Sequence, residues 1–280
     1  MARRQPIELR GSTALVTGSS AGIGLAIARR LAQAGANLVL AARRVEPLEE
    51  AVLSLQSTGV KAIAVPTDVA QLDALEALVD RAIREFGAID VLVNNAGVEA
   101  FCAYEELPLD RIAETISVNL TSALLLARLV IPHMLTAGRG HVINMASTAG
   151  KFGPPFGAAY GTTKAGLINF TQALRAEYRD RGISASVICP GFTEKGGIYD
   201  RMREHSGRRS PFLVGSTTAG RVAAAVVRAI EHDKPELIVN WPPLRPITAF
   251  AELFPTLGGV LIRRASLRFL KRVAQTTSRD

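Results

Sequence analysis

Cysteine is scarce in this sequence, because only Cys102 and Cys189 occur in 280 residues. Two cysteines do not build a disulfide framework, so we expect a reducing compartment, the cytoplasm. The start of the chain, MARRQPIELRG, has basic residues with no apolar run behind them, and it predicts no secretory signal. The chain also lacks an uninterrupted apolar run of about 18 residues, since Arg128 interrupts ALLLARLVI and Arg221 and Arg228 interrupt the alanine-rich run near residue 225. We therefore expect no membrane-spanning helix.

Acidic residues are sparse at the end of the chain, which places most of the net charge of +8 there. Residues 241–280 hold seven basic side chains against two acids, Glu252 and Asp280, and so carry a charge of +5. The basic residues are Arg245, Arg263, Arg264, Arg268, Lys271, Arg272 and Arg279. Neither a basic sheet with interleaved aromatic residues nor a recognisable DNA-reading motif accompanies them. We expect no nucleic-acid partner.

Short β-rich runs alternate with longer helical runs along residues 1–240, and no linker, repeat or low-complexity segment separates them. Most β-rich runs are continuously apolar, which is typical of strands buried on both faces of a sheet. The alternation predicts an α/β fold in one domain, a Rossmann-type doubly wound parallel sheet of about seven strands with helices on both faces. The expected strands are TALVT (13–17), NLVLA (37–41), AIAVP (62–66), DVLVN (90–94), HVINMAS (141–147), SASVIC (184–189) and ELIVN (236–240). The expected helices lie near residues 22–34, 47–57, 72–86, 109–136, 158–181 and 217–232.

The run ALVTGSSAGIGLAIARR places a glycine-rich turn between an expected strand and an expected helix. Gly18, Gly22 and Gly24 permit a tight turn and let backbone N–H groups approach a pyrophosphate at the helix N-terminus. Ser20 and Ile23 lie in the same turn. A lone glycine triplet is a weak signal, but a buried strand before it and an amphipathic helix after it strengthen the signal. The turn predicts a dinucleotide site, and a plain strand–helix turn is the alternative.

The second expected strand lacks an acid at its end, where a site for NAD usually has one to bind the ribose 2′-hydroxyl. Ala42 stands at that position, and Arg43 and Arg44 follow it. An arginine can bind a 2′-phosphate, which an aspartate would repel. We therefore expect NADP(H) to be preferred over NAD(H). The alternative is that both arginines are solvated at the start of the next helix.

The stretch AAYGTTKAG (158–166) holds Tyr160 and Lys164 four residues apart. On a helix these two positions share one face and lie about 6 Å apart along the axis. An ammonium favours the ionised form of a nearby phenol, so we expect a lowered pKa for Tyr160. The phenol then becomes a usable proton donor or acceptor. Taken alone, such a pair is more often a surface pair without function.

Further motifs follow one another in a fixed order. They are TGSSAGIG (17–24), DV (68–69), NNAG (94–97), Asn119 in SVNL, NMAS ending at Ser147, YGTTK (160–164) and PG (190–191). With these motifs, and with Ser147 thirteen positions before Tyr160, roughly residues 11–240 resemble a short-chain dehydrogenase/reductase. The resemblance implies a Rossmann fold, a nicotinamide cofactor and a catalytic role for the tyrosine and the lysine.

The resemblance implies four catalytic residues. Tyr160 would donate a proton to the substrate oxygen in reduction, or remove one in oxidation. Lys164 would lower the pKa of that phenol and hydrogen-bond the nicotinamide ribose. Ser147 would hold the substrate oxygen, and Asn119 would order a water that links the lysine to solvent.

The resemblance also implies cofactor contacts at the adenine, along the middle of the cofactor and at its nicotinamide end. In that order the residues are Asp68 and Val69; Asn95, Ala96 and Gly97; and Pro190, Gly191 and Thr193. Many members of the family have a threonine at the position of Lys195, which departs from the pattern. We expect Thr193 to substitute for it.

Residues 192–216 fall where the family has its substrate lid, and residues 241–280 form a basic extension beyond the family core. The lid mixes apolar residues with arginines, which fits an apolar substrate with an anionic group; alternatively, the charges simply face water. A helix over 257–274 would align one apolar and one basic stripe, and such a helix docks on a membrane surface, on its own fold or on a second subunit. The apolar stripe is Ile262, Ala265, Phe269 and Val273, and the basic stripe is Arg264, Arg268, Lys271 and Arg272.

The leading hypothesis is an NADP(H)-dependent carbonyl reductase or secondary-alcohol dehydrogenase. Its small-molecule substrate would be a lipophilic ketone or alcohol, acyl or steroid-like, held at Ser147 and Tyr160. The alternatives are a non-catalytic NADP-bound sensor or scaffold, and a peripheral membrane protein that acts through its C-terminal helix. We expect no metal site. The resemblance also implies a homodimer or homotetramer, with the fourth and fifth expected helices as interface candidates.

Overall fold

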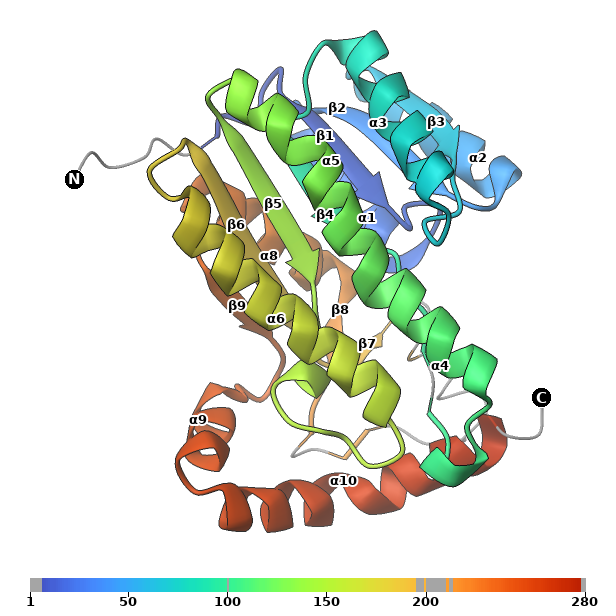
Figure 1. Ribbon diagram of the computed structural model, residues 1–280, viewed down its shortest axis with the longest axis vertical. Coiled ribbons are helices and arrows are strands. Elements are labelled where there is room, and N and C mark those ends of the chain that lie inside the picture. Colours follow the sequence, from blue (N-terminus) through green and yellow to red (C-terminus); the bar gives the residue numbers. More distant parts are fainter. Residues whose placement is uncertain (1–6, 100, 195–198, 200–209, 212–213, 278–280) are drawn as a thin grey trace.

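The computed structural model describes the chain except residues 1–6, 100, 195–198, 200–209, 212–213 and 278–280 (Figure 1). Its main strands are β1 Thr13–Thr17, β2 Asn37–Ala42, β3 Ala62–Pro66, β4 Val91–Asn94, β5 Gly140–Met145, β6 Ile183–Pro190 and β9 Glu236–Val239. These strands form one seven-stranded sheet in the order β3-β2-β1-β4-β5-β6-β9, with every pair parallel. A separate two-stranded sheet pairs β7, Thr193–Glu194, with β8, Thr217–Thr218. The predicted α/β class and doubly wound sheet are confirmed.

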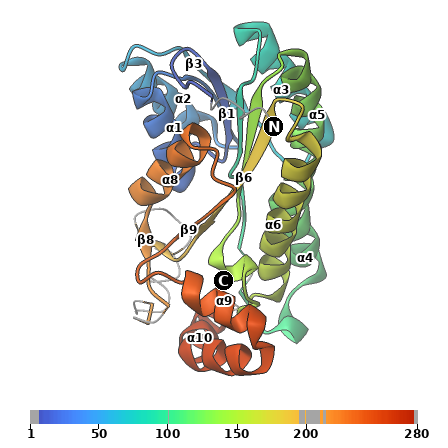
Figure 2. The same cartoon turned by 90° about the vertical axis from the view of Figure 1, so that its left-hand side faces the viewer.

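Helices cover both faces of this sheet. They are α1 Gly22–Gln33, α2 Val45–Gln56, α3 Leu72–Phe86, α4 Leu109–Ile116, α5 Ser122–Thr136, α6 Ala158–Tyr178, α8 Ala219–Glu231, α9 Arg245–Leu253 and α10 Pro255–Thr277, with 3₁₀ turns at Tyr104–Glu106 and Thr148–Gly150. Figure 2 shows α1, α2 and α8 on one face and α3, α4, α5 and α6 on the other. The fourth expected helix is not regular, because a π-helical turn at Ser117–Thr121 separates α4 from α5. The helix expected over 158–181 ends three residues earlier, at Tyr178.

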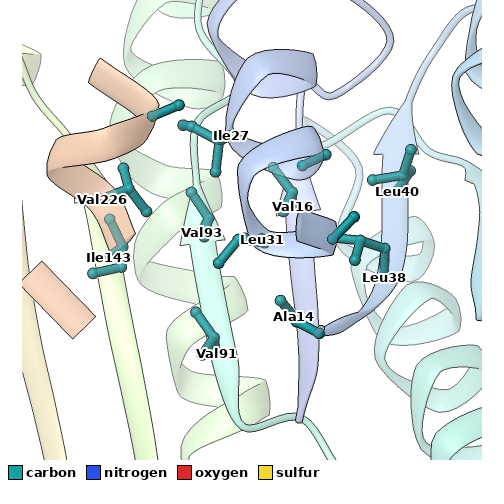
Figure 3. Packing of buried hydrophobic residues seen from close by; sticks show 14 of the residues in the cluster. Ala14, Val16, Ile27, Leu31, Leu38, Leu40, Val91, Val93, Ile143 and Val226 are labelled. Atoms are coloured by element: carbon teal, nitrogen blue, oxygen red, sulfur yellow. The ribbon is translucent and has the colours of Figure 1, made fainter. Parts of the chain in front are cut away.

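Apolar side chains fill the space between the sheet and the layer of α1, α2 and α8. Ile27 and Leu31 of α1 and Val226 of α8 pack over strand residues such as Val16 and Val93 (Figure 3). All five side chains are fully buried. Because both faces are covered in this way, the central strands need apolar residues at consecutive positions. This packing fixes the carboxyl ends of β1, β4 and β5 at one edge of the sheet, where the candidate site forms.

The helical run Leu109–Thr136 is, by length and composition alone, long and apolar enough to cross a membrane. Half of its most apolar window is buried inside the protein, as in the core helix of a globular domain. The run is therefore weak evidence for a membrane span.

The extension beyond β9 folds into α9 and α10, which lie together at one end of the molecule (Figures 1 and 2). Phe269 and Val273 of the expected apolar stripe are buried, and Ile262 and Ala265 are half-buried. The Phe269 ring meets that of Phe192 edge-on, with 5.4 Å between the ring centroids. The expected basic stripe is exposed. Of the alternatives for the apolar stripe, the structure shows packing of Phe269 and Val273 on the protein's own fold. A membrane contact through residues 257–274 stays a prediction.

Candidate active site

The turn between β1 and α1 has backbone conformations that favour glycine. Gly18 and Gly22 have φ angles of +63° and +58°. A Cβ atom on Gly24 would lie 2.2 Å from the carbonyl oxygen of Gly18, so a larger residue would push the helix away from the turn. The N-cap residue of α1 is Ala21, which makes no side-chain capping hydrogen bond. The first N–H groups of α1 therefore keep their capacity to bind a phosphate.

Asn95, directly after β4, holds this turn against the neighbouring strand. Its side-chain amide donates to the carbonyl oxygens of Thr17 at 2.9 Å and Gly18 at 3.2 Å. The hydroxyl of Thr17 accepts from the backbone N–H groups of Asn95 and Ala96, both at 3.0 Å. Thr17 was not among the predicted site residues, although it opens the TGSSAGIG motif. Thr17 and Asn95 together keep the ends of β1 and β4 at a fixed separation.

The end of β2 presents two cations. Ala42 is the last residue of the strand, and the side chains of Arg43 and Arg44 after it are exposed. The guanidinium of Arg44 donates to the hydroxyl of Ser20 in the glycine turn, at 3.5 Å. Beside them, the carboxylate of Asp68 accepts from the backbone N–H two residues later, at 3.1 Å. The arginines and the glycine turn therefore face the same space.

Asn119 lies in the π-helical turn and is only 1% exposed. Its Oδ1 accepts from the N–H of Val98 at 2.7 Å, and its Nδ2 donates to the carbonyl oxygen of the same residue at 2.9 Å. A Cβ atom on Gly97 would lie 3.3 Å from Asn119 Oδ1 and 3.5 Å from Lys164 Nζ, so both side chains meet at this glycine. Helical turns of this π type occur frequently at functional sites.

Tyr160 and Lys164 lie near each other on α6, as their spacing predicts. Lys164 Nζ is 5.6 Å from the centroid of the Tyr160 ring and donates to the carbonyl oxygen of Met145 at 2.9 Å. Ser147, two residues after β5, is hydrogen-bonded to the Tyr160 phenol. Its Oγ also accepts from the N–H of Ala149 at 3.1 Å. The fold thus brings together the serine, tyrosine and lysine that the sequence singled out.

The protonation of this pair differs from the prediction. Burial raises the pKa of Tyr160 from 10.0 to about 12, and the hydrogen bond with Ser147 opposes this only in part. The expected lowering of the Tyr160 pKa is wrong for the protein alone, because desolvation of the phenolate raises this pKa more than the hydrogen bond with Ser147 lowers it. Burial also lowers the pKa of Lys164 from 10.5 to about 8. At neutral pH the phenol keeps its proton and the lysine is cationic.

Two cavities meet at Tyr160. The larger has a volume of about 570 Å³ and extends from the glycine turn past the end of β2 to Lys164; we call it the cofactor cleft. The smaller has a volume of about 130 Å³ and extends from Tyr160 to α10; we call it the apolar pocket. Ile23, Ala146, Tyr160 and Pro190 line both cavities.

Most predicted cofactor residues line the cofactor cleft. They are Gly18, Ser20, Gly22, Ile23, Gly24, Arg43, Arg44, Asp68, Val69, Asn95, Ala96, Gly97, Tyr160, Lys164 and Pro190. Gly191 and Thr193 line the apolar pocket instead, together with Ser147. Asn119 is not part of either lining and lies behind Gly97. Lys195 and most of the expected lid over 192–216 fall outside the described residues.

The apolar pocket also contains residues that were not among the predicted site residues, although Phe192 and Tyr199 lie in the expected lid, 192–216. Its aromatic and apolar wall includes Phe101, Phe152, Phe192, Tyr199 and Leu270, and Ser266 adds a hydroxyl. Ser266 and Leu270 belong to α10, about a hundred residues after Tyr160 in the chain. The apolar stripe of α10 was a signal for a packed face, but it did not say against what. In the cofactor cleft, Glu99 and Arg111 were likewise not predicted.

Metal ligands do not cluster in the part of the chain that the structure describes. Among those residues, no group of three or more His, Cys, Asp or Glu side chains is placed to hold an ion. Cys102 and Cys189 are both buried and free.

Known proteins resemble the chain in sequence. A family model described as short chain dehydrogenase matches residues 12–205. The ketoacyl reductase HetN of Nostoc sp. is 40% identical over 236 residues, which cover 84% of this chain and 81% of that protein. The granaticin polyketide synthase putative ketoacyl reductase 1 of Streptomyces violaceoruber is 41% identical over 194 residues, 69% of this chain and 71% of the relative. D-β-hydroxybutyrate dehydrogenase of Cupriavidus necator is 37% identical over 184 residues, 66% of this chain and 71% of that protein.

Solved structures share the fold. A variant of actinorhodin polyketide ketoreductase with NADPH superposes with a TM-score of 0.77 at 32% identity, over 84% of this chain and 98% of that chain. NAD⁺-bound xylitol dehydrogenase superposes with a TM-score of 0.77 at 30% identity, over 84% and 99% of the two chains.

The site and these likenesses agree. The fold binds a nicotinamide cofactor, and its relatives include reductases and dehydrogenases. The protein is an oxidoreductase that acts on CH–OH and C=O groups of small molecules. Because the family model matches more than half of this chain, the chain belongs to the short-chain dehydrogenase/reductase family.

Proposed function

We propose that the protein is an NADP(H)-dependent reductase that interconverts a lipophilic ketone and its secondary alcohol, with Tyr160 as the general acid and base. The observation that carries this proposal is the position of Tyr160, where the cofactor cleft meets the apolar pocket. A phenol at this junction reaches a substrate oxygen while the substrate carbon faces the cleft. Ser147, hydrogen-bonded to the phenol, offers a second group for the same oxygen.

The cofactor cleft fits a dinucleotide that carries an extra phosphate. The uncapped N-terminus of α1 and the close approach at Gly24 suit a pyrophosphate. Arg43 and Arg44 line the cleft at the end of β2, where they would bind a 2′-phosphate. Because one structural neighbour holds NADPH and another NAD⁺, the preference for NADP(H) rests on these arginines. When bound, the nicotinamide supplies or accepts the hydride.

The residues around the junction move and hold the proton. In reduction, Tyr160 donates its phenolic proton to the carbonyl oxygen as negative charge develops there, and the Ser147 hydroxyl hydrogen-bonds the same oxygen. The raised pKa keeps the phenol protonated beforehand. The ammonium of Lys164 then stabilises the phenolate left by the transfer. Asn119 approaches Lys164 beside Gly97. We expect Asn119 to hold a water through which the Tyr160 phenolate regains its proton.

The apolar pocket supports a lipophilic substrate. Its wall is aromatic at Phe101, Phe192 and Tyr199 and aliphatic at Leu270, which favours an acyl or other extended apolar group next to the ketone. Two of the similar proteins are named ketoacyl reductases, which supports an acyl ketone within this class.

We also propose that the enzyme works in the cytoplasm as a homodimer or homotetramer. Its two free cysteines suit a reducing compartment. Leu109, Ile116 and Leu124 are exposed on α4 and α5, which with α6 cover one face of the molecule (Figure 1). Exposed apolar residues on long helices are typical of subunit interfaces.

The substitution Tyr160→Phe tests the catalytic proposal. It removes the hydroxyl and keeps the ring, so we expect kcat to fall about a thousandfold while the Kd of NADPH stays nearly unchanged. The measurement is NADPH absorbance with a panel of acyl, steroid and other ketones, together with a fluorescence titration of the cofactor. Tyr104→Phe, at an exposed tyrosine, is the matched control. Full turnover in Tyr160→Phe would overturn the role assigned to Tyr160.

A further inference from the structure

The turn between α9 and α10 carries an exposed group of apolar side chains, which we call the hairpin patch. Leu253 is 74% exposed, Leu257 59% and Phe254 52%. The full patch is Phe250, Leu253, Phe254, Leu257, Val260 and Leu261. A contiguous exposed apolar surface costs free energy in water and marks a site of interaction.

The hairpin patch is held by packed helices. The rings of Phe250 and Phe254 are 5.2 Å apart between centroids. A Cβ atom on Gly258 would lie 2.4 Å from the Cα of Ala251, so α10 approaches α9 closely at this glycine. Further along α10, Phe269 and its neighbours are buried in the protein. The helices α9 and α10, which carry the patch, lie at one end of the molecule (Figure 2).

The outward face of α10 changes from apolar to cationic along its length. Arg264, Arg268 and Lys271 follow Leu257 and Leu261 at spacings of three or four residues, and all five side chains are exposed. Residues at these spacings lie on one face of a helix. Between residues 241 and 279 the sequence has a single acid, Glu252. Of the four cations in the expected basic stripe, these three share the face of Leu257 and Leu261, and we call them the basic stripe of α10.

We propose that the hairpin patch and the basic stripe of α10 form a docking site for the surface of an anionic lipid bilayer. The patch side chains enter the boundary between headgroups and acyl chains, and the stripe contacts the lipid phosphates. This face differs from the stripe through Ile262 and Val273, which packs on the protein. The docking site is independent of the proposed catalytic function.

Charge favours a lipid surface over a second copy of the chain. In a two-fold contact through this face, α10 would lie against the same helix of the other copy. The three cations of the basic stripe would then meet the same cations in a parallel contact, or apolar side chains in an antiparallel one, and neither supplies a negative charge. Like charges facing each other disfavour the parallel contact, whereas anionic headgroups supply the opposite charge.

Co-sedimentation of the full chain with lipid vesicles tests the proposal. One vesicle is phosphatidylcholine alone, and the other is an equal mixture of phosphatidylcholine and phosphatidylserine. We expect binding to the mixed vesicles, and we expect Leu253→Asp to lower the partition coefficient at least about tenfold. Leu53→Asp is the matched control, because Leu53 on α2 is 67% exposed and lies outside the patch. That control should sediment as the original chain does.

Two double variants test the basic stripe of α10, one in the stripe and one as a control on α1. Arg264→Gln combined with Arg268→Gln should lower binding to the mixed vesicles by about fivefold for each arginine. Arg29→Gln combined with Arg30→Gln removes the same charge from exposed positions on α1 and should have a smaller effect. Equal losses in the two pairs would mean a response to net charge alone, which overturns the assignment of the stripe.

Three results would overturn the docking site as a whole. They are no binding to the mixed vesicles, equal binding to both kinds of vesicle, and equal loss in Leu253→Asp and Leu53→Asp. Sedimentation equilibrium without lipid tests the alternative that a second copy of the chain covers the patch. If the original chain binds no vesicles and Leu253→Asp forms a smaller oligomer than the original chain, the patch belongs to a contact between two copies. Circular dichroism verifies folding, and Leu257→Ser replaces Leu253→Asp if that variant unfolds.

Discussion

The cofactor cleft and the apolar pocket share Tyr160, but the chain builds them in different ways. The cleft is lined chiefly by residues at the ends of β1, β2, β3 and β4 and in the segments directly after them. The apolar pocket gathers side chains from Ile23 to Leu270, including a helix at the far end of the chain. The cleft is therefore shaped largely by backbone turns, whereas the pocket is shaped by long-range packing of side chains.

This difference implies that the two cavities respond separately to substitution. A change in a glycine turn or at the end of β2 should act on the cofactor, and a change in α10 should act on the substrate. Tyr160 lines both cavities, which is why its substitution is expected to have the largest effect on turnover.

Gly24→Ala should break the cleft and leave the pocket intact. The new Cβ would lie 2.2 Å from the carbonyl oxygen of Gly18, so the turn and α1 must separate. We expect NADPH affinity to fall roughly a hundredfold, measured by fluorescence titration. Gly220→Ala on α8 is the control, because its Cβ would meet no atom within 4 Å. Unchanged affinity in a folded Gly24→Ala protein would contradict the backbone account of the cleft.

Replacing both Arg43 and Arg44 with Ala should change cofactor choice. Loss of charge-assisted hydrogen bonds to a 2′-phosphate should weaken NADPH about thirtyfold, while NADH, which has no such phosphate, changes little. Titrations with both cofactors measure the ratio. Arg29→Ala with Arg30→Ala on the outer face of α1 controls for net charge. Equal losses for the two cofactors would refute the NADP(H) preference.

Lys164 predicts how activity depends on pH. Its pKa of about 8 means that the ammonium is present below that pH and lost above it. We expect kcat/KM for NADPH, which reports the free enzyme, to fall about tenfold for each pH unit above this value. Tyr160, with a pKa of about 12, stays protonated over the same range. Lys164→Arg should remove the fall in kcat/KM, because a guanidinium keeps its charge. A kcat/KM that stays level with pH in the original protein would contradict the role of Lys164.

The same lysine predicts a trend in stability. The pKa of Lys164 is about 8 in the folded state, below its ordinary value of 10.5. Between these two pH values the unfolded chain binds more protons than the folded one, so this group makes the free energy of unfolding rise with pH. Denaturant unfolding of the original protein and of Lys164→Met across this pH range measures the rise in the free energy of unfolding in each, and we expect the rise to be smaller in the variant.

Leu270→Ala should give the smallest effect and act on the pocket alone. Removing part of a buried apolar wall should raise KM for a lipophilic ketone about fivefold and leave NADPH affinity unchanged. Leu261→Ala, at an exposed leucine on the same helix, is the control. Weaker NADPH binding with an unchanged KM would show that the two cavities are not separate.

The sequence by itself determined the doubly wound sheet and most of the cofactor cleft. Gly18 and Gly24 lie in a turn that a local strand–turn–helix pattern predicts, whereas Asn95 was implied by the family resemblance; all three line the cleft. Tyr160 and Lys164 share one helix, and their separation is fixed by its geometry.

Only the tertiary structure decided the protonation of Tyr160, the wall of the apolar pocket and the direction in which α10 faces. Desolvation depends on every atom around a group, and this reversed the expected shift in the pKa of the phenol. The contact of Leu270 with the pocket depends on how a distant helix packs. Periodicity shows which side of a helix is apolar, but its partner is chosen by the packing of the whole molecule.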